Sequence, residues 1–191
     1  MSRSCTRAAA IAVAAAATIA LGTTAAFADN SVAQQITAGT RTSSVASLTL
    51  SPVGYSHVVQ NVAGTLALTV DDSTGSNAGW NVTLQSSPLV WAAGTGGALS
   101  GLNIPASAFA ITSAAEPVMT AGQIIDGTGG PHVPTAAPLG TLDSARKTVQ
   151  AAPAFGNGTY TQALGVNLTI PAYSAAGTYT ALLTTTISAG P

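Results

Sequence analysis

The stretch that decides the fold runs from Leu66 to Gln85 and reads LALTVDDSTGSNAGWNVTLQ. Its two ends alternate apolar and small polar residues with a period of two, which is the pattern of a strand with one buried face. The apolar faces consist of Leu66, Leu68 and Val70 in the first run and Trp80, Val82 and Leu84 in the second. The segment between them, Asp71–Asn77, is rich in turn-forming residues. The stretch therefore predicts two strands joined by a polar turn.

The same alternation returns near the end of the chain, in the runs Val166–Ile170 and Tyr179–Ile187. Further turns are predicted at Gly94–Gly97 and Ser174–Gly177. Many short strands with polar turns, and almost no helical periodicity, predict an all-β protein. We expect an antiparallel β-sandwich, immunoglobulin-like or of a related Greek-key type.

One long irregular insertion is expected between about Ser113 and Phe155, because this stretch is rich in glycine and proline. Within it, a short helix near Asp143–Val149 is the one helix that the pattern indicates, with Asp143 as its cap.

The first 28 residues have the three parts of a secretory signal peptide. Arg3 and Arg7 give a positive start, Ala8–Leu21 is apolar, and Ala26–Ala28 supplies small residues for cleavage. The apolar run is shorter than the roughly 20 residues that a membrane-spanning helix needs. We therefore expect cleavage after Ala28, a single mature domain over 29–191, and no membrane span in that domain.

Charge is sparse in the expected mature domain, which carries three basic and six acidic residues, a formal charge of −3. Nucleic-acid binding needs clustered lysine and arginine, so no nucleic-acid partner is expected. The single cysteine, Cys5, lies in the expected signal peptide. Neither a disulfide nor a cysteine metal site is therefore expected in the mature domain.

Two segments resemble the motifs of a known family of Gram-positive surface proteins. Val70–Thr83 has a strand, an acidic turn and then Gly-Trp-x-aliphatic-Thr, and it resembles the first motif of WxL domains. Thr169–Ile187 has a proline after one strand and Gly-x-Tyr-Thr opening the next, and it resembles the C-terminal motif of that family. The resemblance covers about Ala46 to Pro191, and the Ala-rich, Gly-rich composition fits a high-GC, actinobacterial source.

The chain departs from the family pattern in two places. Val82 stands in place of leucine in the first Trp-x-Leu motif, and Thr185-Thr186-Ile187 stands where the second such motif would be. The second tryptophan is therefore missing, and its loss bears on the wall affinity that membership of this family would imply.

The resemblance implies a secreted domain at the cell wall or cell surface that associates non-covalently with peptidoglycan, beside other WxL-like surface proteins. The candidate ligand-binding residues are Trp80, Asn81, Val82, Trp91, Asp71 and Asp72. The ring of Trp80 could stack on a sugar, with Asn81, Thr83 or the turn carboxylates making hydrogen bonds to it. The favoured interpretation of Trp80 is nevertheless a core residue, because large aromatics at strand spacing usually pack inward. Trp91 is expected near a strand end, where a ring can be partly exposed.

Enzymatic activity is not expected. Asp71 and Asp72 are adjacent on a strand and point to opposite faces, so they cannot flank one glycosidic bond. The turn also fails the standard calcium-loop pattern, although a looser calcium site there stays open. His57 and His132 stand apart from any paired carboxylate or serine motif. We therefore expect no catalytic residue, no cofactor and no metal site.

A second function from another class also fits the sequence. A sandwich whose edge strand pairs with a neighbouring molecule could be a structural subunit of a surface fibre or complex. The Thr-rich final strand and the low charge suit this alternative.

Overall fold

The computed structural model describes residues 32–93, 103–134 and 139–191. The expected signal peptide with Cys5 and the expected turn Gly94–Gly97 lie outside the described residues. The chain divides into two units, Met1–Gln35 and Ile36–Pro191. Residues 32–35 of the first unit have no regular secondary structure, and the second unit holds the strands.

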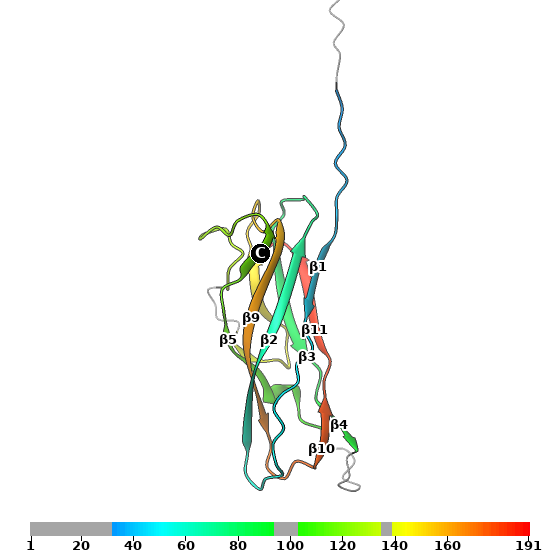
Figure 1. The fold of residues 1–191 in the computed structure, drawn as a ribbon, viewed down its shortest axis with the longest axis vertical. Helices are drawn as coiled ribbons and strands as arrows, with labels where there is room; N and C mark the ends of the chain where they lie inside the picture. Colours follow the sequence, from blue (N-terminus) through cyan, green and yellow to red (C-terminus); the bar gives the residue numbers. More distant parts are fainter. Residues whose placement is uncertain (1–31, 94–102, 135–138) are drawn as a thin grey trace, which may run out of the picture. The chain divides into compact units, whose positions relative to one another are not determined.

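The regular secondary structure in the described part of the second unit is strand, apart from one short 3-10 helix (Figure 1). The elements are β1 (Arg41–Val45), β2 (Gln60–Asp72), β3 (Trp80–Ser86), β4 (Val90–Ala93), η1 (Ala106–Ala108), β5 (Phe109–Ala114), β6 (Val118–Gly122), β7 (Gly140–Thr141), β8 (Arg146–Ala151), β9 (Gly158–Ile170), β10 (Gly177–Thr180) and β11 (Leu183–Ala189). The described strands pair in antiparallel fashion. The predicted all-β, antiparallel class is confirmed.

The larger sheet is organised around β2 and β9, which are 13 residues long each and pair over their full length. The strand order among the described residues is β1-β2-β9-β5-β7, and β6 pairs with the other half of the β9 edge that β5 occupies. Because β9 is so long, it runs from one end of the sandwich to the other and connects the two ends.

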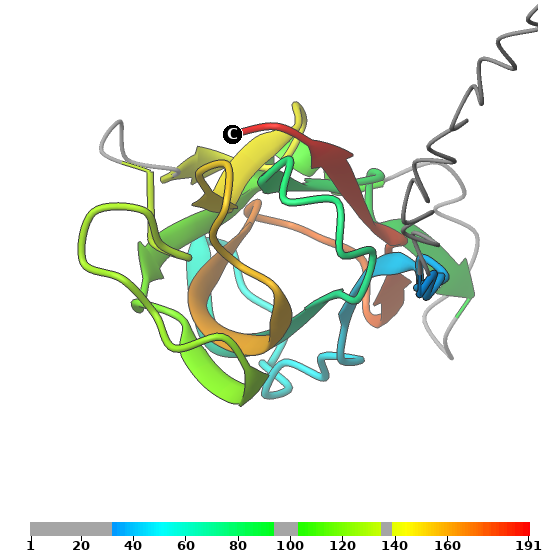
Figure 2. The same ribbon diagram turned by 90° about the horizontal axis from the view of Figure 1, so that it is seen from above.

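The second layer contains the sheet β11-β3-β8 and the two-stranded sheet β10-β4. Figure 2 shows the β3 and β11 ribbons across the core from β9. At one edge the layers meet, because Thr185 Oγ1 on β11 donates to the carbonyl oxygen of Ser43 on β1 at 3.1 Å. The edge of β11 that β3 does not cover therefore lies against β1.

The core lies between the two layers and is formed by the predicted apolar faces. The side chains with at most 2% exposure include Leu66, Leu68 and Val70 of β2, Trp80, Val82 and Leu84 of β3, and Leu164 and Val166 of β9. Burial of each large apolar side chain contributes about 1.5–3 kcal/mol. Alternation in the sequence therefore correctly identified which face of β2, β3 and β9 is buried.

The short helix expected near Asp143–Val149 was a wrong prediction. Asp143 lies in a turn, and the chain from Arg146 onward is the strand β8, which pairs with β3. The Asp143 carboxylate accepts a hydrogen bond from Thr141 Oγ1 at 2.7 Å and caps no helix. Pairing with the edge of β3 satisfies the backbone groups that a helix would otherwise satisfy internally.

The single strand expected over Tyr179–Ile187 is two strands. β10 pairs with β4, whereas β11 pairs with β3. Between them, Leu182 exchanges hydrogen bonds with Ser87, donating its N–H to Ser87 Oγ and accepting at its carbonyl oxygen from Ser87 N–H, both at 2.9 Å. The alternation continues through this change of partner, so the sequence pattern did not reveal it.

The irregular insertion is narrower than expected, because β6, β7 and β8 fall inside Ser113–Phe155. β6 has five exposed residues in succession and no buried face, so it shows no apolar alternation. Its strand conformation comes from backbone pairing with β9.

A buried ion pair closes the end of the sandwich where β2 leads into the turn toward β3. Arg41 Nη2 donates to Asp72 Oδ2 at 2.8 Å, and the two side chains are 12% and 1% exposed. Thr74 donates its N–H and its hydroxyl to the other carboxylate oxygen, at 3.0 and 2.6 Å. Burial raises the pKa of Asp72, but the hydrogen bonds from Arg41 and Thr74 and the Arg41 charge together outweigh it and leave the pKa below its usual value.

We predict that this pair makes the stability of the protein sensitive to acid. Because the folded-state pKa lies below the unfolded value, the stabilisation is present above the unfolded pKa and is lost as pH falls through the folded pKa. The Asp72→Asn variant should lose about 3 kcal/mol at neutral pH, since Arg41 is left without its buried partner. Its free energy of unfolding should then fall less than that of the wild type between about pH 5 and pH 3, measured by urea denaturation.

The surface variant Asp143→Asn is the control, because its side chain is exposed and away from this pair. Equal acid sensitivity of the wild type and Asp72→Asn would show that the ion pair contributes no pH-dependent stability.

Candidate functional site

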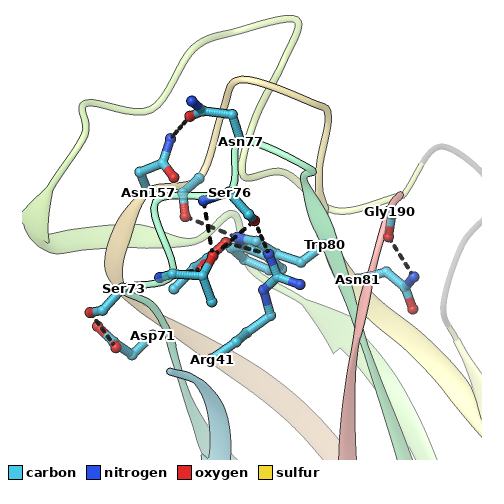
Figure 3. A network of polar contacts seen from close by, with 12 residues as sticks. Arg41, Asp71, Ser73, Ser76, Asn77, Trp80, Asn81, Asn157 and Gly190 are labelled. Atoms are coloured by element: carbon cyan, nitrogen blue, oxygen red, sulfur yellow. Dashed lines mark hydrogen bonds and ion pairs between the residues drawn. The ribbon is translucent and has the colours of Figure 1, made fainter. Parts of the chain in front are cut away.

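The predicted site residues at the end of β2 belong to an internal network of hydrogen bonds (Figure 3). Asp71 accepts from Ser73 Oγ at 2.8 Å and from Thr159 Oγ1 at 2.7 Å. Asp72 points to the other face and is buried with Arg41. The two carboxylates therefore lie on opposite faces of β2, as strand geometry requires.

Trp80 is fully buried, with 0% of its surface exposed. Its Nε1–H donates to the carbonyl oxygen of Gly156 at 2.9 Å, and its ring centroid lies 6.2 Å from that of Tyr160 on β9. Gly156 has a φ of +80°, and a Cβ there would lie 2.6 Å from Trp80 Nε1, so a side chain at this position would displace the ring. The burial agrees with the interpretation of Trp80 as a core residue and leaves no face of the ring for an external ligand.

The two neighbours of Trp80 in the first motif also have internal partners. Val82 is 0% exposed and belongs to the same core. Asn81 is half-buried, and its Nδ2 donates to the carbonyl oxygen of Gly190 at 2.8 Å. The residues of the first motif thus contact other parts of the same protein. Ligand roles for Asn81, Asp71 and Asp72 remain predictions.

Trp91 lies apart from these residues, in β4, where it pairs with Tyr179 of β10. The ring is half-buried, and its Nε1–H donates to the carbonyl oxygen of Ala176 at 3.3 Å. This is the lower end of the sandwich in Figure 1, where β4 and β10 are labelled. Trp91 and Trp80 therefore do not form one site.

An open cleft of about 570 Å³ lies at this same end, next to the Trp91 strand pair. Its walls are the segment that joins β1 to β2, at residues 48–56, and the segment from the end of β9 to the start of β11. Core side chains form its floor, including Leu168, Phe109 and Ile104. This volume lies within the range of about 300–1,000 Å³ that is typical of small-molecule sites.

Three aromatic side chains form a cluster beside this cleft. The rings of His57 and Tyr173 are stacked, with centroids 5.2 Å apart, and Tyr55 meets His57 edge-on at 5.3 Å. Tyr55 and Tyr173 are 61% and 60% exposed. Clustered aromatic rings that stay exposed in a folded protein are typical of interaction sites.

Backbone contacts hold this aromatic cluster in place. Tyr173 N–H donates to the carbonyl oxygen of Ser56 at 2.9 Å, and Ser56 Oγ accepts from Val58 N–H at 3.1 Å. Tyr173 also has a φ of +62°, a conformation that costs free energy for a residue other than glycine. The hydrogen bond between the two loops helps to maintain this conformation.

The sequence contained a signal for this cluster that pattern reasoning did not use. Tyr55 follows Gly54, and Tyr173 follows Pro171-Ala172 just before the predicted turn Ser174–Gly177, so both aromatics lie in loops. Aromatic residues in loops are candidates for exposed contact residues. What the sequence could not show is that two loops more than a hundred residues apart lie next to each other.

Burial raises the pKa of Tyr179, which lines the cleft and donates its hydroxyl proton to the carbonyl oxygen of Ala175 at 3.0 Å. Tyr179 is therefore a neutral phenol at physiological pH. Its hydroxyl is a polar, uncharged group at this end of the molecule.

Comparison with known proteins identifies one family. The family model described as "WxL domain surface cell wall-binding" matches residues 18–191. No curated protein and no solved structure matches the chain. In the described residues, no helix is long and apolar enough to cross a membrane.

We predict that the role of Trp80 is to stabilise the fold. Trp80→Phe retains most of the ring but removes the donor to Gly156, so it should destabilise the fold by about 1–3 kcal/mol. Trp80→Ala should cost about 3–5 kcal/mol, as expected for removal of a fully buried aromatic. The half-buried Trp91 gives the matched control Trp91→Phe, which should cost less than about 1 kcal/mol. Urea denaturation measures all three, and equal losses at the two tryptophans would contradict a special core role for Trp80.

Proposed function

The chain belongs to the family of WxL domain surface cell wall-binding proteins, and from this premise we propose that it attaches non-covalently to the peptidoglycan of a Gram-positive cell wall through the cleft between residues 48–56 and the β9–β11 segment. Family membership places the protein at the cell surface or cell wall. The family is a wall-binding family and not a family of enzymes.

The observation that carries the choice of site is the contrast between the two ends of the sandwich. At the motif end, Trp80 and Val82 are buried, and the turn carboxylates accept hydrogen bonds from the protein itself. At the other end, exposed Tyr55 and Tyr173 adjoin an open cleft. Only the second arrangement leaves aromatic surface for an external polymer.

Binding without catalysis is the activity we propose for this cleft. General acid and base catalysis requires titratable groups that reach one reacting bond. Asp71 and Asp72 lie on opposite faces of β2, and neither lines the cleft. The attachment thus needs contact surface and hydrogen-bonding groups, and no proton transfer.

The alternative of a fibre subunit receives less support. The Thr-rich strand β11 pairs with β3 on one edge and lies against β1 on the other, where Thr185 donates to Ser43. A neighbouring molecule would have to displace this contact before it could pair with β11.

We predict that the purified protein pellets with isolated peptidoglycan sacculi and stays in the supernatant without them. Binding should survive acid removal of other wall polymers and should be lost after muramidase digestion. Gly54 lines the cleft, and no atom lies within 4 Å of the place that a Cβ would take there, so Gly54→Glu adds a carboxylate at the cleft with open space around its Cβ. The affinity of this variant should fall by about tenfold or more, because ligand contact would bury an unpaired charge.

Gly127→Glu is the matched control, since Gly127 also has open space around it and lies outside the cleft. Equal loss in both variants would indicate general repulsion by an anionic wall and not a cleft. Failure of the wild type to pellet would refute wall attachment, and sedimentation that depends on protein concentration alone would support the fibre subunit.

A further inference from the structure

The chemistry of the cleft indicates which part of the wall polymer it would hold. Of the charged residues in the described ranges, none lines the cleft. The polar side chains that line it carry hydroxyls and one amide, among them Ser51, Gln60, Thr178 and Thr180. A charged ligand entering this cleft would lose its hydration without gaining an opposite charge, which is costly. The ligand that fits is therefore uncharged where it touches the protein.

The aromatic cluster adds a second requirement. The stacked pair His57–Tyr173 and the edge-on Tyr55 present ring surface that is fixed relative to the cleft. Tyr55 itself lines the cleft, and Tyr173 lies between the lining residues Pro171 and Ser174. Such rings favour a ligand with a flat apolar face, and the apolar C–H face of a pyranose ring is one.

Hydrogen-bonding capacity gives the third requirement. Hydroxyl and amide side chains both donate and accept, so they can pair with sugar hydroxyls and with acetamido groups. The apolar floor, with Leu168 and Phe109, suits the methyl group of an acetamido substituent. A ligand that combines a flat apolar face, uncharged polar groups and a small apolar substituent satisfies all three.

We infer that the cleft binds the uncharged N-acetylhexosamine units of the glycan strand, with Tyr55 and Tyr173 stacking on the sugar rings. The inference rests on the proposed wall attachment and specifies the part of the polymer recognised. The stem peptide of peptidoglycan carries carboxylates and an amine, for which the cleft has no charged partner among the described residues. Anionic wall polymers have the same mismatch.

The test uses the tetramer of N-acetylglucosamine as an uncharged soluble probe and a soluble stem peptide as a charged one, both titrated calorimetrically into the protein. The tetramer should bind, and the peptide should not. Tyr55→Ala and Tyr173→Ala should each weaken tetramer binding by about tenfold, whereas Tyr173→Phe, which keeps the ring, should stay within about twofold. Ile124→Ala removes an exposed apolar side chain outside the cleft and should bind like the wild type.

Urea denaturation of each variant separates a lost contact from a lost fold. A tyrosine variant with wild-type stability and weakened binding supports the stacking role. Unchanged tetramer binding in both alanine variants, or binding of the stem peptide in place of the tetramer, would overturn the inference. If sacculi still pellet the wild type while the tetramer does not bind, the glycan assignment fails and wall attachment stands. If sacculi do not pellet the wild type, the proposed function itself fails.

Discussion

The buried indole of Trp80 is the constraint on which the arrangement of the two sheets depends. A fully buried N–H group must find an acceptor inside the protein, and the carbonyl oxygen of Gly156 is the one it uses. This bond ties β3 to the turn that leads into β9, while the ring packs near Tyr160 of β9 itself. Because position 156 has no room for a Cβ, glycine there is part of the same arrangement. One side chain thereby links both layers of the sandwich.

The polar groups near Trp80, at the turn between β2 and β3, also form hydrogen bonds within the protein. Arg41 and Thr74 hold the Asp72 carboxylate, and Ser73 and Thr159 hold that of Asp71. The acidic turn thus joins β1, β2 and β9, and both of its carboxylates accept hydrogen bonds from the protein itself. A sequence motif can characterise a family because it builds the fold, even when its residues do not touch the ligand.

At the opposite end of the sandwich, aromatic side chains are exposed and not buried. Its loops leave tyrosine rings in solvent, and the floor of its cleft is continuous with the core between the sheets. The absence of charge from the lining, within the described residues, sets what can enter: groups that satisfy hydroxyls and amides without needing a counter-charge. The low charge of the whole chain also fits recognition of an uncharged glycan strand.

The sequence by itself determined the fold class and the buried faces, because a period of two directly reports which side chains share a face of a strand. Leu66, Leu68, Val70 and the Trp80 run were placed correctly for this reason. β6 was not foreseen, since it has no buried face, and the break between β10 and β11 was missed because alternation continues across a change of partner. The motif also placed candidate ligand contacts at Trp80, whose ring the structure buries. Only the tertiary structure brought Tyr55 and Tyr173 together beside a cleft, because contacts between distant loops depend on the path of the chain and leave no periodic trace in the sequence.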